Sequence, residues 1–473
     1  MNNSQFIKIL KTLSTDEKKK FRKFLLSPYF NTNKILVKLF DHLTKKYKGY
    51  TNINENKVFQ FIYPGKKVNK KRIRDLSSEM LGLCERFMAE ETFSVQKNRI
   101  DLCTLNSYNR NNLKNGFLRK FNGSYNEISK SKINYEHYLD ITSLDKEIFR
   151  FYNTWNYLDA SKNADHIMNN TAKTISFEIL RCAFAFEALA KVNQFTYDKK
   201  FSEELMKLIK RFDYFNDPVI KLYYALCLIH KNPGKDLFFS IKRQFEDIEN
   251  RISDDIKKEV LTTLHNFLYT SQGQFSISEI RAESYDLLTY IFNNRLECDA
   301  NGYIIINYFL NYSDLLIHYK KYNEVAELIE RSKDRLGTFA LKDDTINFTY
   351  AQLHYSKGEF SIALKYLDLI SFKDKELYSF KKSFELNCYY ELQDFMMIDK
   401  QIDSCKKYYI RNSDTRQFES FKPYIKAIEK LIKHYDNKRF LEEQLSQING
   451  SAAFRHRKWL IDKLTERIRE MGR

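Results

Sequence analysis

The sequence predicts an all-α protein, and three observations carry this prediction. Only 12 glycines and 5 prolines occur among 473 residues, well below the usual shares of about 7 % and 5 %, which disfavours a fold rich in tight β-turns. Polar and apolar residues do not alternate strictly, so no sheet is expected. Apolar residues instead recur at helical spacing, and one segment near residue 354 recurs 35 residues later.

Helix signals are sharpest near the N-terminus. Ser14 and Glu17 form a capping-box pattern, and the helix that follows should stop at Ser27, because Pro28 disfavours a helical residue before it. A second helix is expected over about 32–47, and a third from a cap at Asn69 to about residue 92. One apolar stripe marks this third helix: Ile73, Leu76, Met80, Leu83 and Phe87.

Further along the chain, short polar segments predict turns between successive helices. The predicted turns are Asn122-Gly123, Asn216-Asp217-Pro218, Asn232-Pro233-Gly234, Ser271-Gln272-Gly273 and Asn301-Gly302. A last helix over about 451–471 carries Leu460, Leu464 and Ile468 on one face. We expect it to cap the end of a helical array, which needs a polar outer face there.

The segment at 354–360, HYSKGEF, returns at 389–395 as YYELQDF. An imperfect earlier copy begins at His318 and matches if two residues are deleted, which makes His318 and His354 equivalent and structural. Small residues let two helices approach, a glycine takes the turn, and an aromatic residue fills the wedge between helices. The positions expected to serve the repeat in this way are Ala351, His354, Gly358, Phe360, Ala363, Tyr389 and Phe395.

A period near 34 residues is typical of tetratricopeptide repeats, and residues 349–409 resemble that family. The resemblance implies a right-handed α-solenoid of helical hairpins joined to a small basic helical module at the N-terminus. We expect three parts: the basic module at 1–94, degenerate hairpins at 95–300, and the clearer solenoid with its capping helix at 301–473. The whole chain also resembles bacterial proteins of this size, a resemblance that implies no activity.

The net charge of +18 belongs to the two ends of the chain. Residues 1–100 hold 22 Lys and Arg against 9 Asp and Glu, whereas residues 101–400 hold 40 against 42. One cluster is unusual because it places cations in the first turns of a helix, where acidic residues are preferred. Its members are Lys66, Lys67, Lys70, Lys71 and Arg74.

This cluster has two readings. In the first, it is a solvated run of charge or is paired with an acidic patch elsewhere in the fold. In the second, it is a site for phosphate or carboxylate groups that approach the unpaired N–H groups of a helix start. The basic residues of the first long helix extend the same surface in the second reading: Lys18, Lys19, Lys20, Arg22 and Lys23.

Chemistry-bearing motifs are missing from the sequence. No nucleotide-binding, metalloprotease or nucleophile-elbow pattern occurs, and no two histidines stand at a ligand spacing. We therefore expect no catalytic residue, no metal and no cofactor. The seven scattered cysteines indicate a reducing compartment, so a cytoplasmic location without a membrane span is expected.

The leading hypothesis is a non-catalytic scaffold that binds a peptide or a helix of another protein on the concave face of the solenoid. The alternative is binding of nucleic-acid backbone through the basic N-terminal and C-terminal helices. An enzyme is the third hypothesis, and it would need a pocket in the middle region with converging titratable groups.

Overall fold

The computed structural model is all-helical, as predicted. It describes residues 3–155, 161, 163–193, 196, 198–211, 216–271, 273–337, 339–371, 375–411, 416–451 and 456–472. These residues form 23 α-helices, two short 3-10 helices and no strand. Contacts divide the chain into two compact units, Met1–Tyr223 and Tyr224–Arg473. The division into three parts stays a prediction.

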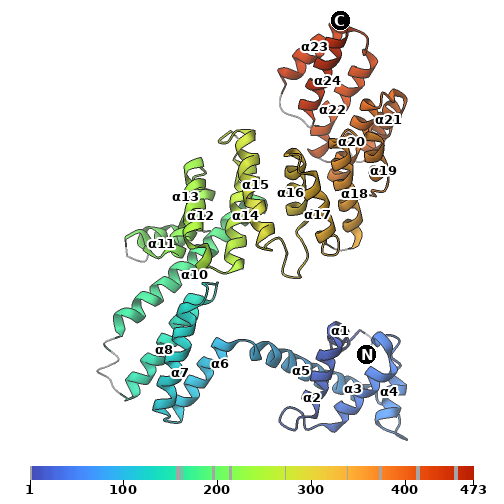
Figure 1. Cartoon of the computed structure of the whole chain (residues 1–473). Coiled ribbons are helices and arrows are strands. Elements are labelled where there is room, and N and C mark those ends of the chain that lie inside the picture. The colour runs from blue at the N-terminus through green and yellow to red at the C-terminus, as the bar shows by residue number, and fades with distance from the viewer. Residues whose placement is uncertain are drawn as a thin grey trace. The chain divides into compact units, whose positions relative to one another are not determined.

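Figure 1 shows the helices of the first unit, and α12 crosses the boundary. They are α1 (Gln5–Thr12), α2 (Thr15–Leu26), α3 (Lys34–Lys46), η1 (Lys48–Tyr50), α4 (Glu55–Ile62), α5 (Lys70–Ser94), α6 (Lys97–Arg110), α7 (Lys114–Lys130), α8 (His137–Trp155), α10 (Ala164–Asn193), α11 (Lys200–Arg211) and α12 (Pro218–Lys231).

The second unit continues as a succession of helices with short connections. They are α13 (Lys235–Ile248), η3 (Glu249–Arg251), α14 (Asp254–Thr270), α15 (Ile277–Asn293), α16 (Ile306–His318), α17 (Tyr322–Ser332), α18 (Phe339–Ser356), α19 (Phe360–Asp368), α20 (Lys375–Glu391), α21 (Phe395–Arg411), α22 (Arg416–Lys433), α23 (Lys438–Asn449) and α24 (Arg457–Glu470).

Helices α1–α5 share one hydrophobic core that extends from Phe6 to Phe87. The capping box is confirmed, since Ser14 accepts from the backbone of Glu17 and Glu17 reaches back, and α2 ends before Ser27. The predicted stripe on α5 is wrong at one place, because Cys84 is buried and Leu83 only half-buried. The eight-residue helices α1 and α4 were not predicted, because two turns are too short to establish a period.

Four of the five predicted turns lie between helices, although Gln272 of one of them lies outside the described residues. Pro218 opens α12, where a missing N–H costs nothing. The turn predicted at Asn122-Gly123 is wrong, because α7 runs through both residues. A Cβ placed at Gly123 would meet nothing within 4 Å, so this glycine marks an open helix face. The chain turns earlier instead, at Asn112, which adopts a positive φ of 59°.

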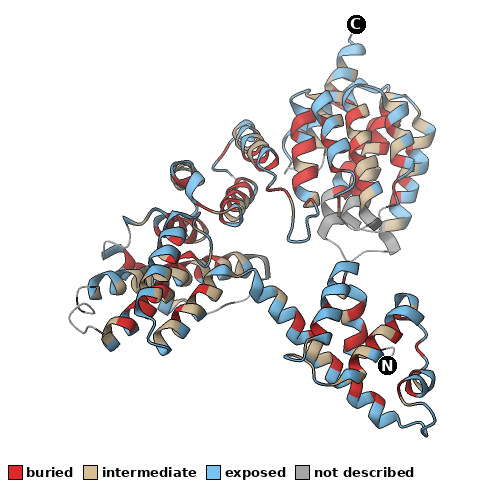
Figure 2. Cartoon of the chain, turned by 60° about the horizontal axis from the view of Figure 1, so that its bottom comes forward, coloured by how far each residue is buried: buried red, intermediate tan, exposed pale blue. Residues whose placement is uncertain are grey.

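Buried and exposed residues alternate around most helices, as Figure 2 shows, so each helix buries one face against its neighbours. The predicted C-terminal helix is present as α24, and Leu460 and Leu464 are fully buried. Among the described residues, no helix is long and apolar enough to cross a membrane.

His265, on α14, provides a test of core packing through pH. It is 3 % exposed, and burial lowers its pKa from 6.5 to about 4. The unfolded chain takes up a proton on this residue below pH 6.5, whereas the folded chain does not until about pH 4. The fold should therefore lose up to about 3 kcal/mol as the pH falls through this window. Stability is unaffected by His265 above it.

A His265→Gln variant should not show this loss. Hydrogen exchange of the α14 amides, corrected for intrinsic rates, measures it at pH 7, 5.5 and 4. We expect protection in the wild type to fall more steeply than in the variant. Parallel curves for the two proteins would show that His265 is not held neutral by the fold.

Candidate functional site

The predicted basic cluster lies at the start of α5, where Asn69 caps the helix by accepting from Arg72 N–H at 3.1 Å. Its five cations, at 66, 67, 70, 71 and 74, are all exposed. None of them has a carboxylate within 4 Å among the described residues, and Lys66 lies over the Tyr63 ring at 5.8 Å. The cluster is thus a group of unpaired charges on one helix start, which suits an anionic partner.

The cations of α2 behave differently. Arg22 binds Asp41 through two nitrogens at 2.8 and 2.9 Å, Lys20 binds Glu91 at 2.5 Å, and Lys19 binds Asp16 at 3.0 Å. These pairs neutralise three of the five cations of α2. Lys20 reaches Glu91 near the end of α5, so the extension of the cluster at the start of α5 by α2 stays a prediction.

In the second unit, three hairpins close with the same backbone turn. Helices α16, α18 and α20 each end at a residue with positive φ: Lys320 at 58°, Gly358 at 77° and Gln393 at 58°. In each case the next N–H donates to the carbonyl five residues earlier, at 2.8–2.9 Å. This is the Schellman motif, which satisfies carbonyls that the helix end leaves unpaired.

The shared turn corrects one part of the predicted register. When the two turns are aligned, Lys320 corresponds to Gly358 and no residue needs to be deleted, so the two hairpins are offset by 38 residues. Leu316 is therefore the counterpart of His354, and His318 is not. An aromatic residue opens the second helix of each hairpin: Tyr322, Phe360 and Phe395.

The other predicted repeat positions lie in or beside the core. Ala351 is 1 % exposed and Ala363 is fully buried, where α18 packs on α19. His354 stacks on Tyr366 at 5.4 Å, and its Nδ1 lies 2.5 Å from Glu359 across the turn. Tyr389 is half-buried against the core of the last helices, as is Phe395. These contacts give the repeat residues a packing role.

Helix α24 covers part of α20. Trp459 Nε1 donates to Glu391 Oε1 at 3.2 Å, and Lys463 Nζ donates to Glu391 Oε2 at 2.9 Å. His456 Nε2 lies 2.8 Å from Ser383 Oγ, which stands eight residues before Glu391 in α20. An acidic residue on the first helix of a hairpin is thus paired by donors from a crossing helix.

The shared turn aligns Glu391 with Ser356 and His318, and Asn387 with Gln352 and Asp314. We call the four aligned residues on α16 and α18 the open face: Asp314, His318, Gln352 and Ser356. Asp314 is exposed, yet surrounding protein raises the pKa of its carboxyl through burial. Burial also lowers the pKa of His318, and the charges of Arg281 and Lys458 act in the same direction. The Oε1 of Gln352 is buried and has no hydrogen-bond partner among the described residues.

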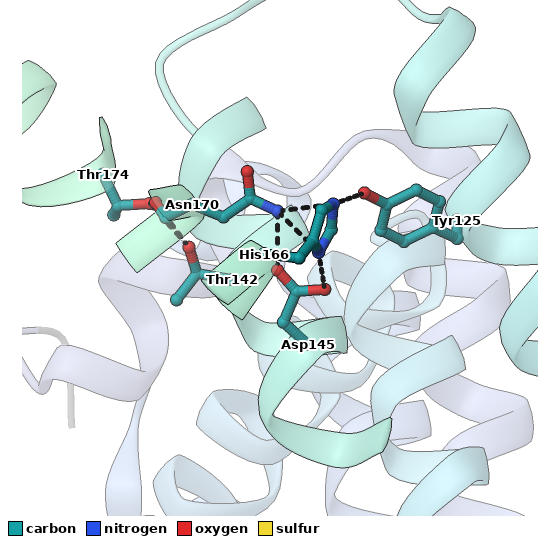
Figure 3. Close-up of polar contacts among 6 residues, drawn as sticks. All are labelled: Tyr125, Thr142, Asp145, His166, Asn170 and Thr174. Carbon is teal, nitrogen blue, oxygen red and sulfur yellow. Dashed lines mark hydrogen bonds and ion pairs between the residues drawn. The ribbon is translucent and has the colours of Figure 1, made fainter. Parts of the chain in front are cut away.

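Sequence reasoning missed a polar network between α7, α8 and α10, which Figure 3 shows. Asp145 is 2 % exposed, and its Oδ2 accepts from Asn170 at 2.8 Å. The Oδ1 of Asp145 lies 3.6 Å from His166 Nδ1, and Tyr125 OH lies 3.1 Å from His166 Nε2. Burial raises the pKa of the Asp145 carboxyl, while Asn170 and His166 oppose this shift.

This network joins titratable groups in the middle region, as an enzyme would require. However, both imidazole nitrogens of His166 are already engaged, and no serine or cysteine lies within the group. Tyr125, Asp145 and His166 line none of four cavities in the described part of the chain. The arrangement ties three helices together, and Asp145 is satisfied by its neighbours Asn170 and His166.

The remaining groups with chemical potential are the metal-ligand side chains and the cysteines. Among the described residues, no group of three His, Cys, Asp or Glu side chains could hold a metal ion. All seven cysteines are free thiols, and burial raises the pKa of Cys84 to about 12. No protein-family model matches the chain, and no curated protein is significantly similar to it.

The hairpin turn leads to a prediction about stability. A side chain in the left-handed region costs about 1 kcal/mol, and glycine avoids this cost. Gln393→Gly should therefore stabilise the hairpin by up to about 1 kcal/mol, whereas Gly358→Ala should destabilise its own hairpin by a similar amount. A Cβ at Gly358 would meet nothing within 4 Å, so that loss would be purely conformational.

Hydrogen exchange in α18–α21 measures both effects. Gln393→Ala is the matched control, because it removes the side chain but keeps the strained backbone, and it should change little. If Gln393→Gly instead lowers protection, the turn is not strained in the folded chain.

Proposed function

We propose that the protein is a non-catalytic scaffold whose hairpins α16–α21 belong to a tetratricopeptide-like right-handed solenoid. Its partner would be a helix or peptide of another protein, bound along the open face of α16 and α18. The observation that carries the proposal is the contact between α24 and α20. A helix that supplies Trp and Lys donors already lies against one hairpin, whereas Asp314 and His318 of α16 and Ser356 of α18 are exposed.

The chemistry of the open face indicates the kind of partner. Asp314 has no cation within 4 Å among the described residues, and the Gln352 oxygen lacks a donor. A partly enclosed carboxylate gains from a charge-assisted hydrogen bond, since its own pKa is raised by burial. A helix with Lys or Arg on the binding side would donate to Asp314, as α24 donates to Glu391.

A site-specific crosslinker tests this proposal. A photoreactive amino acid at His318 should capture a discrete segment of a partner in cells, whereas the same residue at Glu327, exposed on α17, should not. The captured segment is then synthesised as a labelled peptide, and its affinity is measured by fluorescence anisotropy. Asp314→Lys should weaken binding by about tenfold or more, because it replaces attraction by repulsion.

Equal capture from positions 318 and 327 would contradict the proposal, because it would mean non-specific encounter. An unchanged affinity of the Asp314→Lys variant would do the same. Either outcome would move the binding surface away from the open face.

A second function is favoured by the unpaired charges of α5. We propose that the cluster at 66–74 binds the phosphate backbone of a nucleic acid, without reading its sequence. Five exposed cations within nine residues lack acidic partners, while three of the five cations of α2 are paired within the module. Such contacts give an affinity that falls steeply between about 50 and 200 mM salt.

Salt titrations with a labelled 20-base-pair duplex and a single-stranded RNA measure this. The triple variant Lys70→Gln, Lys71→Gln, Arg74→Gln should reduce the slope of log K against log salt by about 3, since each phosphate contact contributes about 1.

A matched control on α3 removes the same charge from another exposed surface of the module. It carries the changes Lys34→Gln, Lys38→Gln and Lys45→Gln, and it should keep the wild-type slope. If both triple variants weaken binding equally, net charge rather than the α5 cluster would attract the nucleic acid, and the site would be rejected.

A further inference from the structure

A cavity of about 310 Å³ lies between α15 and α17 in the second unit, and three arginines converge on it. It is lined by Phe292, Arg295, Glu297, Arg331 and Arg335. These residues come from the end of α15, the segment after it, and the end of α17. Guanidinium groups that meet in one cavity repel one another, so the cavity is suited to an anion.

The backbone holds these segments in place. Arg295 ends α15 with a positive φ of 57°, and the next N–H donates to Ile291 O at 2.9 Å. Ile304 N–H donates to Arg335 O at 2.7 Å, and Ile305 N–H donates to Glu297 O at 2.9 Å. The residues on opposite sides of the cavity are thus tied together through one extended segment.

The side chains are also positioned. Arg331 lies over the Phe292 ring at 5.5 Å, and Phe292 stacks on Tyr312 at 4.8 Å. Arg335 Nη2 donates to Glu297 Oε1 at 3.3 Å. Arg295 and Arg331 have no carboxylate within 4 Å among the described residues, so two of the three guanidinium groups stay unpaired.

Glu297 supplies a second, independent observation. It is 3 % exposed, yet its Oε2 has no hydrogen-bond partner among the described residues. A buried, unsatisfied carboxylate oxygen is costly unless something donates to it. The cavity therefore has a surplus of positive charge. Glu297 lines it, and its buried Oε2 becomes an acceptor for a ligand once the side chain turns toward the cavity.

We propose that this cavity binds a small phosphate monoester that also carries a hydroxyl or amino group. The phosphate would lie among Arg295, Arg331 and Arg335, and the donor of the ligand would bind Glu297 Oε2. Three arginines and one glutamate leave a charge of +2, which a dianionic phosphate balances and a single carboxylate does not. The volume is at the lower end for small-molecule pockets, so it accommodates an organic group besides the phosphate.

Calorimetric titration of the full chain with O-phosphoethanolamine, inorganic phosphate and acetate tests the proposal. We expect saturable binding in the order O-phosphoethanolamine, phosphate, acetate. Arg295→Gly is the decisive variant, because glycine adopts the positive φ without strain while the guanidinium is lost. It should weaken O-phosphoethanolamine by about tenfold or more, as should Arg331→Gln.

Lys333→Gln is the matched control. Lys333 lies between Arg331 and Arg335 in the sequence, pairs with Glu330 at 2.6 Å and does not line the cavity, so its loss should leave affinity unchanged. Glu297→Gln should abolish the preference for O-phosphoethanolamine over phosphate. Absence of saturable binding, or equal weakening by Lys333→Gln and Arg295→Gly, would overturn the proposal.

Discussion

A single backbone closure determines how the hairpins of this chain are built. The first helix ends on a residue with positive φ, and the following N–H returns to the carbonyl five residues before it. Lysine, glycine and glutamine take this position in α16, α18 and α20, and asparagine takes it in α6. Since three of these four are not glycine, helix packing must offset the strain of about 1 kcal/mol at each turn.

The same closure explains which caps and turns could be predicted from the sequence and which could not. Caps such as Ser14 and Asn69 were predicted because they depend on one side chain and its nearest amides. The turn at Asn112 and the register at Lys320 were missed, because the left-handed position is defined by the backbone and tolerates several residue types. At Gly123 the error was the opposite one, because a turn was predicted where the helix continues. A glycine in mid-helix resembles a turn signal when its neighbours in space are unknown.

The candidate sites were likewise predictable only where their residues are neighbours in the sequence. The cations at 66–74 were predicted because they are neighbours in sequence, and what was not predictable was the pairing of Arg22 and Lys20 with distant acids. The network around Asp145 and the arginine cavity had no sequence signal. Their members are separated by about 20–40 residues and belong to no motif, so only the packing of helices brings them together. Ion pairs and hydrogen bonds between segments that are distant in the sequence were therefore the main features that local sequence patterns could not predict.

The position of α24 has a consequence for competition. Because α24 belongs to the same chain as α20, it is present beside Glu391 at a high effective concentration, on the millimolar scale for short tethers. A foreign helix with weaker intrinsic affinity therefore cannot displace it at ordinary cellular concentrations. If the hairpins bind a helix as proposed, the C-terminal helix would act as a permanent internal competitor at α20. Loss of α24 would then change not only stability but also the length of hairpin surface open to a partner.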